Sequence, residues 1–188
     1  MAMRDDIEKV LLTESQLSER VAQLGRQISE DYQGKDLVMV SLLKGAVVFV
    51  TDLMRAIDIH TQIDFMSVSS YGGTTSTGEV KILKDLDIKL ENCDLLVVED
   101  ILDTGRTLSY ISEILKARSP ESFKICTLLD KPSRREANVN ADYVGFVIPD
   151  EFVVGYGLDY NEKYRNLPYI GVLKSSVYTA EDAEIMKK

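Results

Sequence analysis

Two adjacent acidic residues, Glu99 and Asp100, stand at the end of an apolar run in the middle of the chain. Neighbouring carboxylates repel each other and raise each other's pKa unless a cation or sugar hydroxyl groups neutralise them. The turn at 103–105, Asp-Thr-Gly, follows and opens a helical pattern. Unpaired N–H groups at the start of a helix bind anions, and the helix dipole assists. The pattern at 97–108 therefore predicts a site that binds a phosphate next to sugar hydroxyl groups or a cation.

A simpler interpretation is that Asp103 or Thr104 only caps the helix. It accounts for Asp103 and Gly105 but leaves the two acids at the strand end unexplained. Known glycine-rich phosphate loops do not match this stretch. Asp100 occupies the first glycine position of Gly-x-x-x-x-Gly-Lys-Ser/Thr, and no Gly-x-Gly-x-x-Gly occurs in the sequence.

The elements that must hold these residues are visible as short apolar runs that alternate with helical patterns. Strands are expected at 7–12, 36–43, 62–70, 93–101, 123–129, 143–148, 152–154 and 168–173. Helices are expected after a capping pattern at Thr13 and Gln16, at 46–57 and at 106–118. Continuous apolar strands between helices predict an α/β fold with a central, mostly parallel twisted sheet flanked by helices. Ligands bind beyond the carboxyl ends of such strands, which selects the segments 44–45, 70–79, 99–107 and 130–135.

Length and composition predict one globular domain of 188 residues. The net charge of −9 argues against general binding to nucleic acid or to anionic membranes. The N-terminus has no signal-peptide pattern, and the longest apolar stretch is too short to span a bilayer. Cys93 and Cys126 lie far apart beside apolar runs, which predicts buried free thiols and a cytoplasmic location.

Residues 97–108 resemble the phosphoribosyl diphosphate signature of type I phosphoribosyltransferases. That signature is a hydrophobic strand, two acids, two apolar residues, Asp-Thr-Gly, a variable or basic residue, and Thr. The resemblance implies that phosphoribosyl diphosphate binds here with Mg²⁺, and that Asp103 is the catalytic base. The implied contacts to the sugar substrate are Glu99, Asp100, Asp103, Thr104, Gly105, Arg106 and Thr107.

Further segments resemble the hypoxanthine-guanine branch of this family. They are LLKG at 42–45, SSYG at 69–72, LLDKPSRR at 128–135 and FVVGYGLDYNE at 152–162, followed by Arg165. Orotate, uracil and adenine enzymes are not expected to share the last two segments, so a 6-oxopurine base is indicated. The branch implies a single domain over 1–188, a mobile lid at about 70–80 beginning with Ser70 and Tyr71, and a small hood of the terminal segments that includes about 150–175.

The same resemblance implies a role for each matching residue in binding diphosphate and metal. Lys44 and Gly45 would hold the diphosphate in a loop with a cis peptide, and Arg165 would meet the same group. The resemblance also implies that Mg²⁺ contacts Glu99, Asp100 and Asp159. A solvated lysine and a surface arginine are the alternative interpretations of Lys44 and Arg165.

The purine is implied to contact Lys131, Phe152, Val153 and Asp159. Lys131 would donate a hydrogen bond to O6, and Phe152 would stack on the base beside the Val153 backbone. Without the resemblance, Lys131 is a strand-end lysine in water and Phe152 is a core residue.

The implied activity is transfer of a 5-phosphoribosyl group to N9 of hypoxanthine, and of guanine, in purine salvage. Two alternatives stay open: a regulatory or RNA-binding protein that kept this fold, and a relative that prefers xanthine or another base. The lack of a basic stripe argues against the first. Small-molecule substrates are the expected partners, and the family implies a homodimer or homotetramer.

Overall fold

The computed structural model describes residues 2–70 and 80–178, so Tyr71 and the rest of the predicted lid at 71–79 lie outside the described residues. The strands are β1 (Ile7–Leu12), β2 (Leu37–Leu43), β3 (Thr61–Ser70), β4 (Val80–Lys84), β5 (Asp94–Leu102), β6 (Ser122–Asp130), β7 (Tyr143–Val147), β8 (Val153–Val154) and β9 (Ile170–Leu173). The helices are α1 (Glu14–Asp31), α2 (Val47–Ala56) and α3 (Arg106–Lys116), with 3₁₀ turns at Met3–Asp6 and Pro132–Arg134. Within the described part of the chain, no helix has the length and apolar character needed to cross a membrane.

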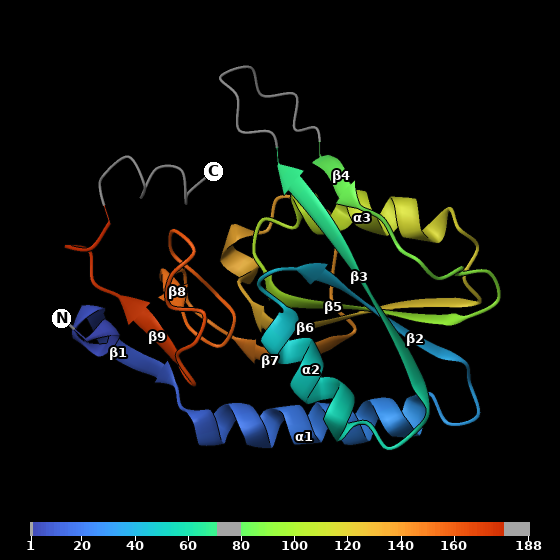
Figure 1. The fold of residues 1–188 in the computed structure, drawn as a ribbon, viewed down its shortest axis with the longest axis horizontal. Coiled ribbons are helices and arrows are strands. Elements are labelled where there is room, and N and C mark those ends of the chain that lie inside the picture. Colours follow the sequence, from blue (N-terminus) through green and yellow to red (C-terminus); the bar gives the residue numbers. More distant parts are fainter. Residues whose placement is uncertain (1, 71–79, 179–188) are drawn as a thin grey trace.

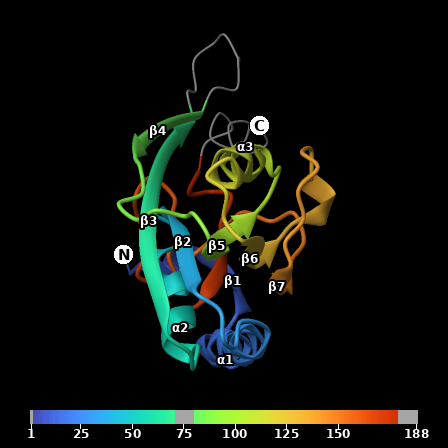
Figure 2. The same cartoon turned by 90° about the vertical axis from the view of Figure 1, so that its right-hand side faces the viewer.

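A six-stranded sheet forms the centre of the molecule, in the order β4-β3-β2-β5-β6-β7 (Figure 1). All of its pairings are parallel except that of β4 with β3 at the edge. α1 and α2 cover one face and α3 covers the other (Figure 2). The α/β fold predicted from the sequence is confirmed.

The central strands are buried on both faces, which explains their continuous apolar sequences. In β2, Met39 packs with the core under α1 and α2, while Val38 packs with the core under α3. In β5, Leu96 packs with the core under α1 and α2, and Leu95 packs with the core under α3. Cys93 and Cys126 are buried and form no disulfide, as predicted.

The first long helix, α1, begins with the predicted capping box. The Thr13 hydroxyl accepts a hydrogen bond from the Gln16 N–H at 3.3 Å, and the Gln16 side chain accepts one from the Thr13 N–H at 2.9 Å. Both contacts satisfy N–H groups that have no partner inside the helix. The helix is thereby fixed where its apolar stripe meets the sheet.

A second sheet, in the order β1-β9-β8, is antiparallel and joins the two ends of the described chain. We call this sheet and the connection at 155–169 the hood. It lies beside the central sheet at the end where the red and dark blue segments meet in Figure 1. The hood built from terminal segments is therefore present.

The strand β4 was not predicted from the sequence. It is an edge strand whose Leu83 is 61% exposed, so it lacks the continuous apolar run by which the central strands are recognised.

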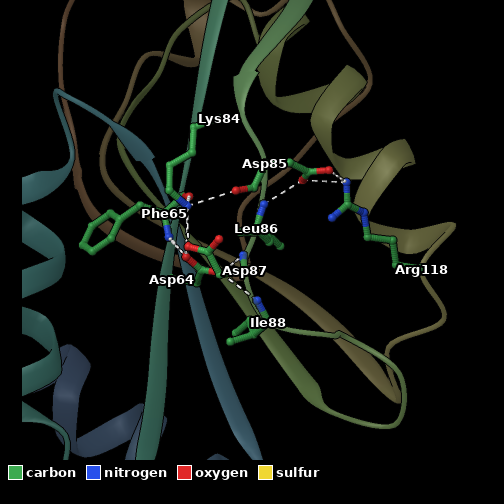
Figure 3. Close-up of polar contacts among 8 residues, drawn as sticks. All are labelled: Asp64, Phe65, Lys84, Asp85, Leu86, Asp87, Ile88 and Arg118. Atoms are coloured by element: carbon green, nitrogen blue, oxygen red, sulfur yellow. Dashed lines mark hydrogen bonds and ion pairs between the residues drawn. The ribbon is translucent and has the colours of Figure 1, made fainter.

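A buried carboxylate, Asp64 on β3, holds the chain that follows β4 (Figure 3). It accepts hydrogen bonds from the backbone N–H groups of Asp87 at 2.6 Å and Ile88 at 3.1 Å, and the Lys84 ammonium lies 3.5 Å away. Burial raises the pKa of Asp64, but the backbone donors and Lys84 outweigh it and keep that pKa below its ordinary value. A polar anchor thus adds to the apolar contacts that Ile82, Leu86 and Ile88 make with the core at this edge of the sheet.

Candidate active site

A cavity of about 250 Å³ opens at the carboxyl ends of β2, β3 and β5. It brings together seven residues predicted from the sequence, namely Gly45, Glu99, Asp100, Asp103, Thr104, Gly105 and Thr107. A larger hollow of about 630 Å³ lies between α1, α2 and the hood, but Arg165 is the one predicted site residue that lines it. We assign the chemistry to the smaller cavity, because the buried acids and the helix start both face it.

Of the paired acids at the end of β5, Glu99 is buried and Asp100 is half-buried. Burial, together with the charge of Asp100, raises the pKa of Glu99 well above its ordinary value. Burial also raises the pKa of Asp100 to about 6, although the N–H of Ile101 donates to this carboxylate at 2.8 Å. Removal from water penalises both charges, so the pair is short of neutralising partners.

The turn at 103–107 leaves the start of α3 available to an anion. The N-cap residue is Gly105, whose φ of 78° is in the left-handed region that favours glycine and which has no side chain to cap the helix. Asp103 is therefore not a helix cap, and the Thr104 hydroxyl reaches only the Arg106 N–H at 3.5 Å. The Arg106 guanidinium pairs with Glu136 at 2.5 Å.

The loop after β2 approaches the acids closely. The Leu43–Lys44 peptide is cis, as the family resemblance implied. A Cβ at position 45 would collide with the Asp100 carboxylate, so a larger residue there would displace that side chain. The Lys44 ammonium points away to Glu162, which it meets at 3.1 Å on an exposed surface.

Arg165 and Asp159 of the hood lie next to this loop. The Arg165 guanidinium is 2.9 Å from Asp159 and 3.4 Å from Glu162, and it donates to the Gly157 carbonyl at 2.8 Å. Its positive charge lowers the pKa of Asp100, whereas Asp159 raises it. Arg165 and Asp159 are thus close enough to act on the buried acids without lining their cavity.

Lys131 follows β6 directly across from Asp103. Its N–H donates to the Leu102 carbonyl at 3.0 Å, which fixes the backbone on the neighbouring strand. The ammonium is buried, donates to the Glu151 carbonyl at 2.8 Å and lies 3.7 Å from the Asp150 carboxylate. Burial lowers the pKa of Lys131, and the charges of Asp103 and Asp150 oppose this effect.

Asp103 itself is surrounded by cations from the segment after β6. Arg134 Nε lies 2.9 Å from Asp103 Oδ1, and Arg135 donates to the Asp103 carbonyl and to Asp130. Burial raises the pKa of Asp103, while Arg134 and then Lys131 oppose that rise.

The predicted purine platform belongs to an aromatic group in the hood. The Phe152 ring meets Tyr160 edge-on with centroids 6.0 Å apart, and it meets Tyr178 at 5.6 Å. Val153 is buried in β8, paired with Val172 of β9. Ser70 ends β3, at the border of the described residues.

The fit to a divalent cation differs among the three predicted contacts. Glu99 and Asp100 offer the hard oxygen donors that Mg²⁺ prefers, and their raised pKa values fit a site that needs positive charge. Asp159 already uses both oxygens, one with Arg165 and the other with the Glu162 N–H, each at 2.9 Å. Among the described residues, no three acidic, histidine or cysteine side chains gather into a metal cage.

Sequence reasoning did not single out Arg134, Asp150 and Glu162, which contact the predicted site residues Asp103, Lys131 and Lys44 respectively. For Arg134 the available signal was the charge of the segment at 130–135, where four of six side chains are ionisable. Their partners lie on other elements, so only the folded chain identifies them.

Known proteins resemble this chain over nearly all of its length. The phosphoribosyl transferase domain model matches residues 10–161. The hypoxanthine-guanine phosphoribosyltransferase of Staphylococcus aureus is 58% identical over 178 residues, which cover 94% of this chain and 99% of that protein. The bifunctional protein TilS/HprT of Listeria monocytogenes is 55% identical over 95% of this chain, which spans 28% of that protein's length.

A solved structure agrees with the sequence comparison. The crystal structure of a hypoxanthine phosphoribosyltransferase from Staphylococcus aureus matches with a TM-score of 0.91 at 58% identity, over 94% of this chain and 97% of that chain. The chain therefore belongs to the phosphoribosyltransferase family, in its hypoxanthine-guanine branch.

Proposed function

We propose that this protein transfers the 5-phosphoribosyl group of phosphoribosyl diphosphate to N9 of hypoxanthine or guanine, giving IMP or GMP and diphosphate. One observation carries the proposal: a single cavity holds the adjacent acids Glu99 and Asp100 together with the open start of α3. The free N–H groups at the helix start can bind a phosphate, and the two carboxylates can accept hydrogen bonds from ribose hydroxyl groups.

The reaction is a displacement at the anomeric carbon. The N9 lone pair forms the new bond to C1′, the C1′–O bond breaks, and its electron pair leaves with diphosphate. The N7 proton of the purine passes to the Asp103 carboxylate, which acts as general base. Glu99 and Asp100 hold the ribose hydroxyl groups and place negative charge beside a carbon that resembles an oxocarbenium ion.

The departing diphosphate is stabilised by the loop after β2 and by the hood. Lys44 would turn from Glu162 toward the diphosphate, joining Gly45 and Arg165, and developing negative charge is favoured beside their N–H groups and cations. Mg²⁺ held through Glu99 and Asp100, with Asp159 as a further contact, would neutralise diphosphate oxygens as a Lewis acid. The 5′-phosphate would bind the N–H groups at 104–107 with the Thr104 and Thr107 hydroxyls, and Arg106 would exchange Glu136 for the phosphate.

The purine lies against the hood in this proposal. Lys131 donates to O6, Phe152 stacks on the ring, and the Val153 backbone and Asp159 meet the pyrimidine edge of the base. The edge-on contacts of Phe152 with its aromatic neighbours support a ring held in one orientation.

The direct test supplies phosphoribosyl diphosphate and Mg²⁺ with hypoxanthine, guanine, xanthine, adenine, uracil or orotate, and follows nucleotide formation by absorbance. Hypoxanthine and guanine should react. Excess EDTA should abolish tight binding of phosphoribosyl diphosphate, because that substrate and the acids are all anionic. A protein that forms no nucleotide with any base, or binds the sugar substrate equally well in EDTA, would contradict the proposal.

The wider setting is proposed on the family resemblance and on composition. We propose one domain over 1–188, a cytoplasmic location, and assembly as a homodimer or homotetramer, which light scattering would measure. Salt-dependent binding to RNA would instead favour the regulatory alternative.

A further inference from the structure

An arginine to which no role was assigned, within the segment at 128–135, lies against Asp103. Arg134 ends the 3₁₀ turn Pro132–Arg134, and its Nε is 2.9 Å from Asp103 Oδ1. The Arg134 side chain is 13% exposed and that of Asp103 is 31% exposed. The pair is therefore shielded enough for the charge contact to matter, unlike ion pairs on an open surface.

We propose that Arg134 is a positioning residue for Asp103: its guanidinium keeps the carboxylate charged and oriented while leaving it able to accept the purine proton. The inference rests on the proposed function, since Asp103 acts as a base only if a purine N7 proton is transferred.

Arg134 and Asp103 interact through their charges and not through a directed hydrogen bond. Asp103 Oδ1 is shielded from solvent and has no hydrogen-bond partner among the described residues, although Arg134 Nε is near. A directed hydrogen bond to the anion would stabilise it further and make it a weaker base. The Asp103 side chain is 31% exposed although Oδ1 is shielded, so part of its surface beyond Oδ1 is open. Arg134 can hold one oxygen while the other meets the purine.

Asp150 links this pair to the residue that is proposed to read the base. The Asp150 carboxylate lies 3.6 Å from Arg134 Nη1 and 3.7 Å from Lys131 Nζ. Arg135 meanwhile fixes the Asp103 backbone through its carbonyl. Alternating charges therefore connect the proposed base and the proposed O6 donor, so that both are set in place before substrate binds.

Electrostatics support the same role. Burial raises the pKa of Asp103, and Arg134 is the strongest of the charges that oppose this rise, ahead of Lys131 and Arg135, while Asp150 adds to it. Loss of the Arg134 charge should raise the pKa further. Asp103 would then be protonated at higher pH and unable to accept the N7 proton.

The test combines Arg134→Met and Arg134→Lys with Asp103→Asn. Arg134→Met should lower kcat roughly tenfold, as loss of one interaction with a charged group does. The acid limb of its pH–rate profile should move to higher pH, while the Kd for phosphoribosyl diphosphate stays unchanged. Arg134→Lys should restore part of the rate. In the Asp103→Asn background, Arg134→Met should have no further effect, because the group through which it acts is gone.

Arg55→Met is the matched control, since it removes the same charge from a 76% exposed side chain on α2. It should leave kcat and the pH profile unchanged. If Arg134→Met lowers kcat equally in the wild-type and Asp103→Asn backgrounds, or in neither, the inference about Arg134 is overturned. The proposed function would still stand in that case, provided that the wild type is active and Asp103→Asn is impaired. A wild type that forms no nucleotide overturns both.

Discussion

The two ends of the candidate site are built in opposite ways. At the proposed phosphate end, the residues at 99–107 are consecutive in sequence, and the adjacent acids Glu99 and Asp100 are short of positive charge. At the purine end, Lys131 and Arg134 already contact carboxylates from other segments. The phosphate end thus depends on what binds to it, whereas the purine end is organised by the protein itself.

This difference suggests that one end of the site sets the affinity for the sugar substrate and the other sets the selectivity for the base. Acids that lack partners gain most from a metal or from sugar hydroxyl groups, so the phosphate end should control binding of the sugar substrate. A lysine held in place before binding cannot adapt to a base that lacks its acceptor, so the purine end should control the choice of base. Each prediction below changes one end and asks whether the other responds.

The largest expected effect concerns the choice of base. Adenine carries an amino donor where hypoxanthine carries the O6 acceptor, so the Lys131 ammonium and the amino group would face each other as two donors. A site built for a specific polar group rejects an analogue that lacks it by up to about 10⁴-fold. Steady-state kcat/KM for the two bases measures this ratio. Comparable kcat/KM values for adenine and hypoxanthine would show that Lys131 does not select the group at position 6. The proposal for the phosphate end would still stand.

The next largest effect concerns the proton. Asp103→Asn keeps the size of the side chain but removes the base, and turnover should fall by about 10² or more. Binding of phosphoribosyl diphosphate, measured by calorimetry, should change little. Near-normal turnover would mean that the N7 proton leaves by another route, such as water.

A smaller loss is expected from Lys131→Met. The variant keeps most of the buried stem but removes the donor to O6, so kcat/KM for hypoxanthine should fall roughly tenfold or more. The Kd for the sugar substrate should not change if the two ends are independent. A parallel loss of sugar binding would show that they are coupled through Asp103.

The smallest effect on catalysis is expected from Asp64→Asn, which lies outside both ends. The amide cannot accept all the backbone hydrogen bonds of the carboxylate, so the free energy of unfolding should fall by about 1–3 kcal/mol. Denaturant titration measures this loss, and kcat should stay unchanged. Asp58→Asn, at an exposed position, is the control and should have little effect.

The pH dependence of that stability follows from the lowered pKa of Asp64. A carboxyl group whose folded pKa lies below its unfolded value stabilises the fold above the unfolded pKa of about 4 and loses this contribution as pH falls through the folded pKa. The difference between wild type and Asp64→Asn should therefore shrink in acid. A difference that is constant from pH 7 to the acid range would assign the loss to packing.

The sequence alone determined the features that arise from neighbouring residues. The apolar runs of β2 and β5 predicted the parallel sheet, and Thr13 and Gln16 predicted the helix start. The pattern at 97–108 predicted a candidate site, and its residues do line one cavity. Periodicity, capping and turn formation act over a few residues, so their causes can be read along the chain.

Tertiary structure alone decided which distant side chains meet. Lys44 contacts Glu162 across 118 positions, and Arg134 was brought to Asp103 because β5 and β6 pair side by side. The edge strand β4 also needed the fold, since Asp64 anchors the chain beyond it by hydrogen bonds rather than by an apolar run. An ion pair depends on strand order and register, and no local pattern of residues records these before the sheet has formed.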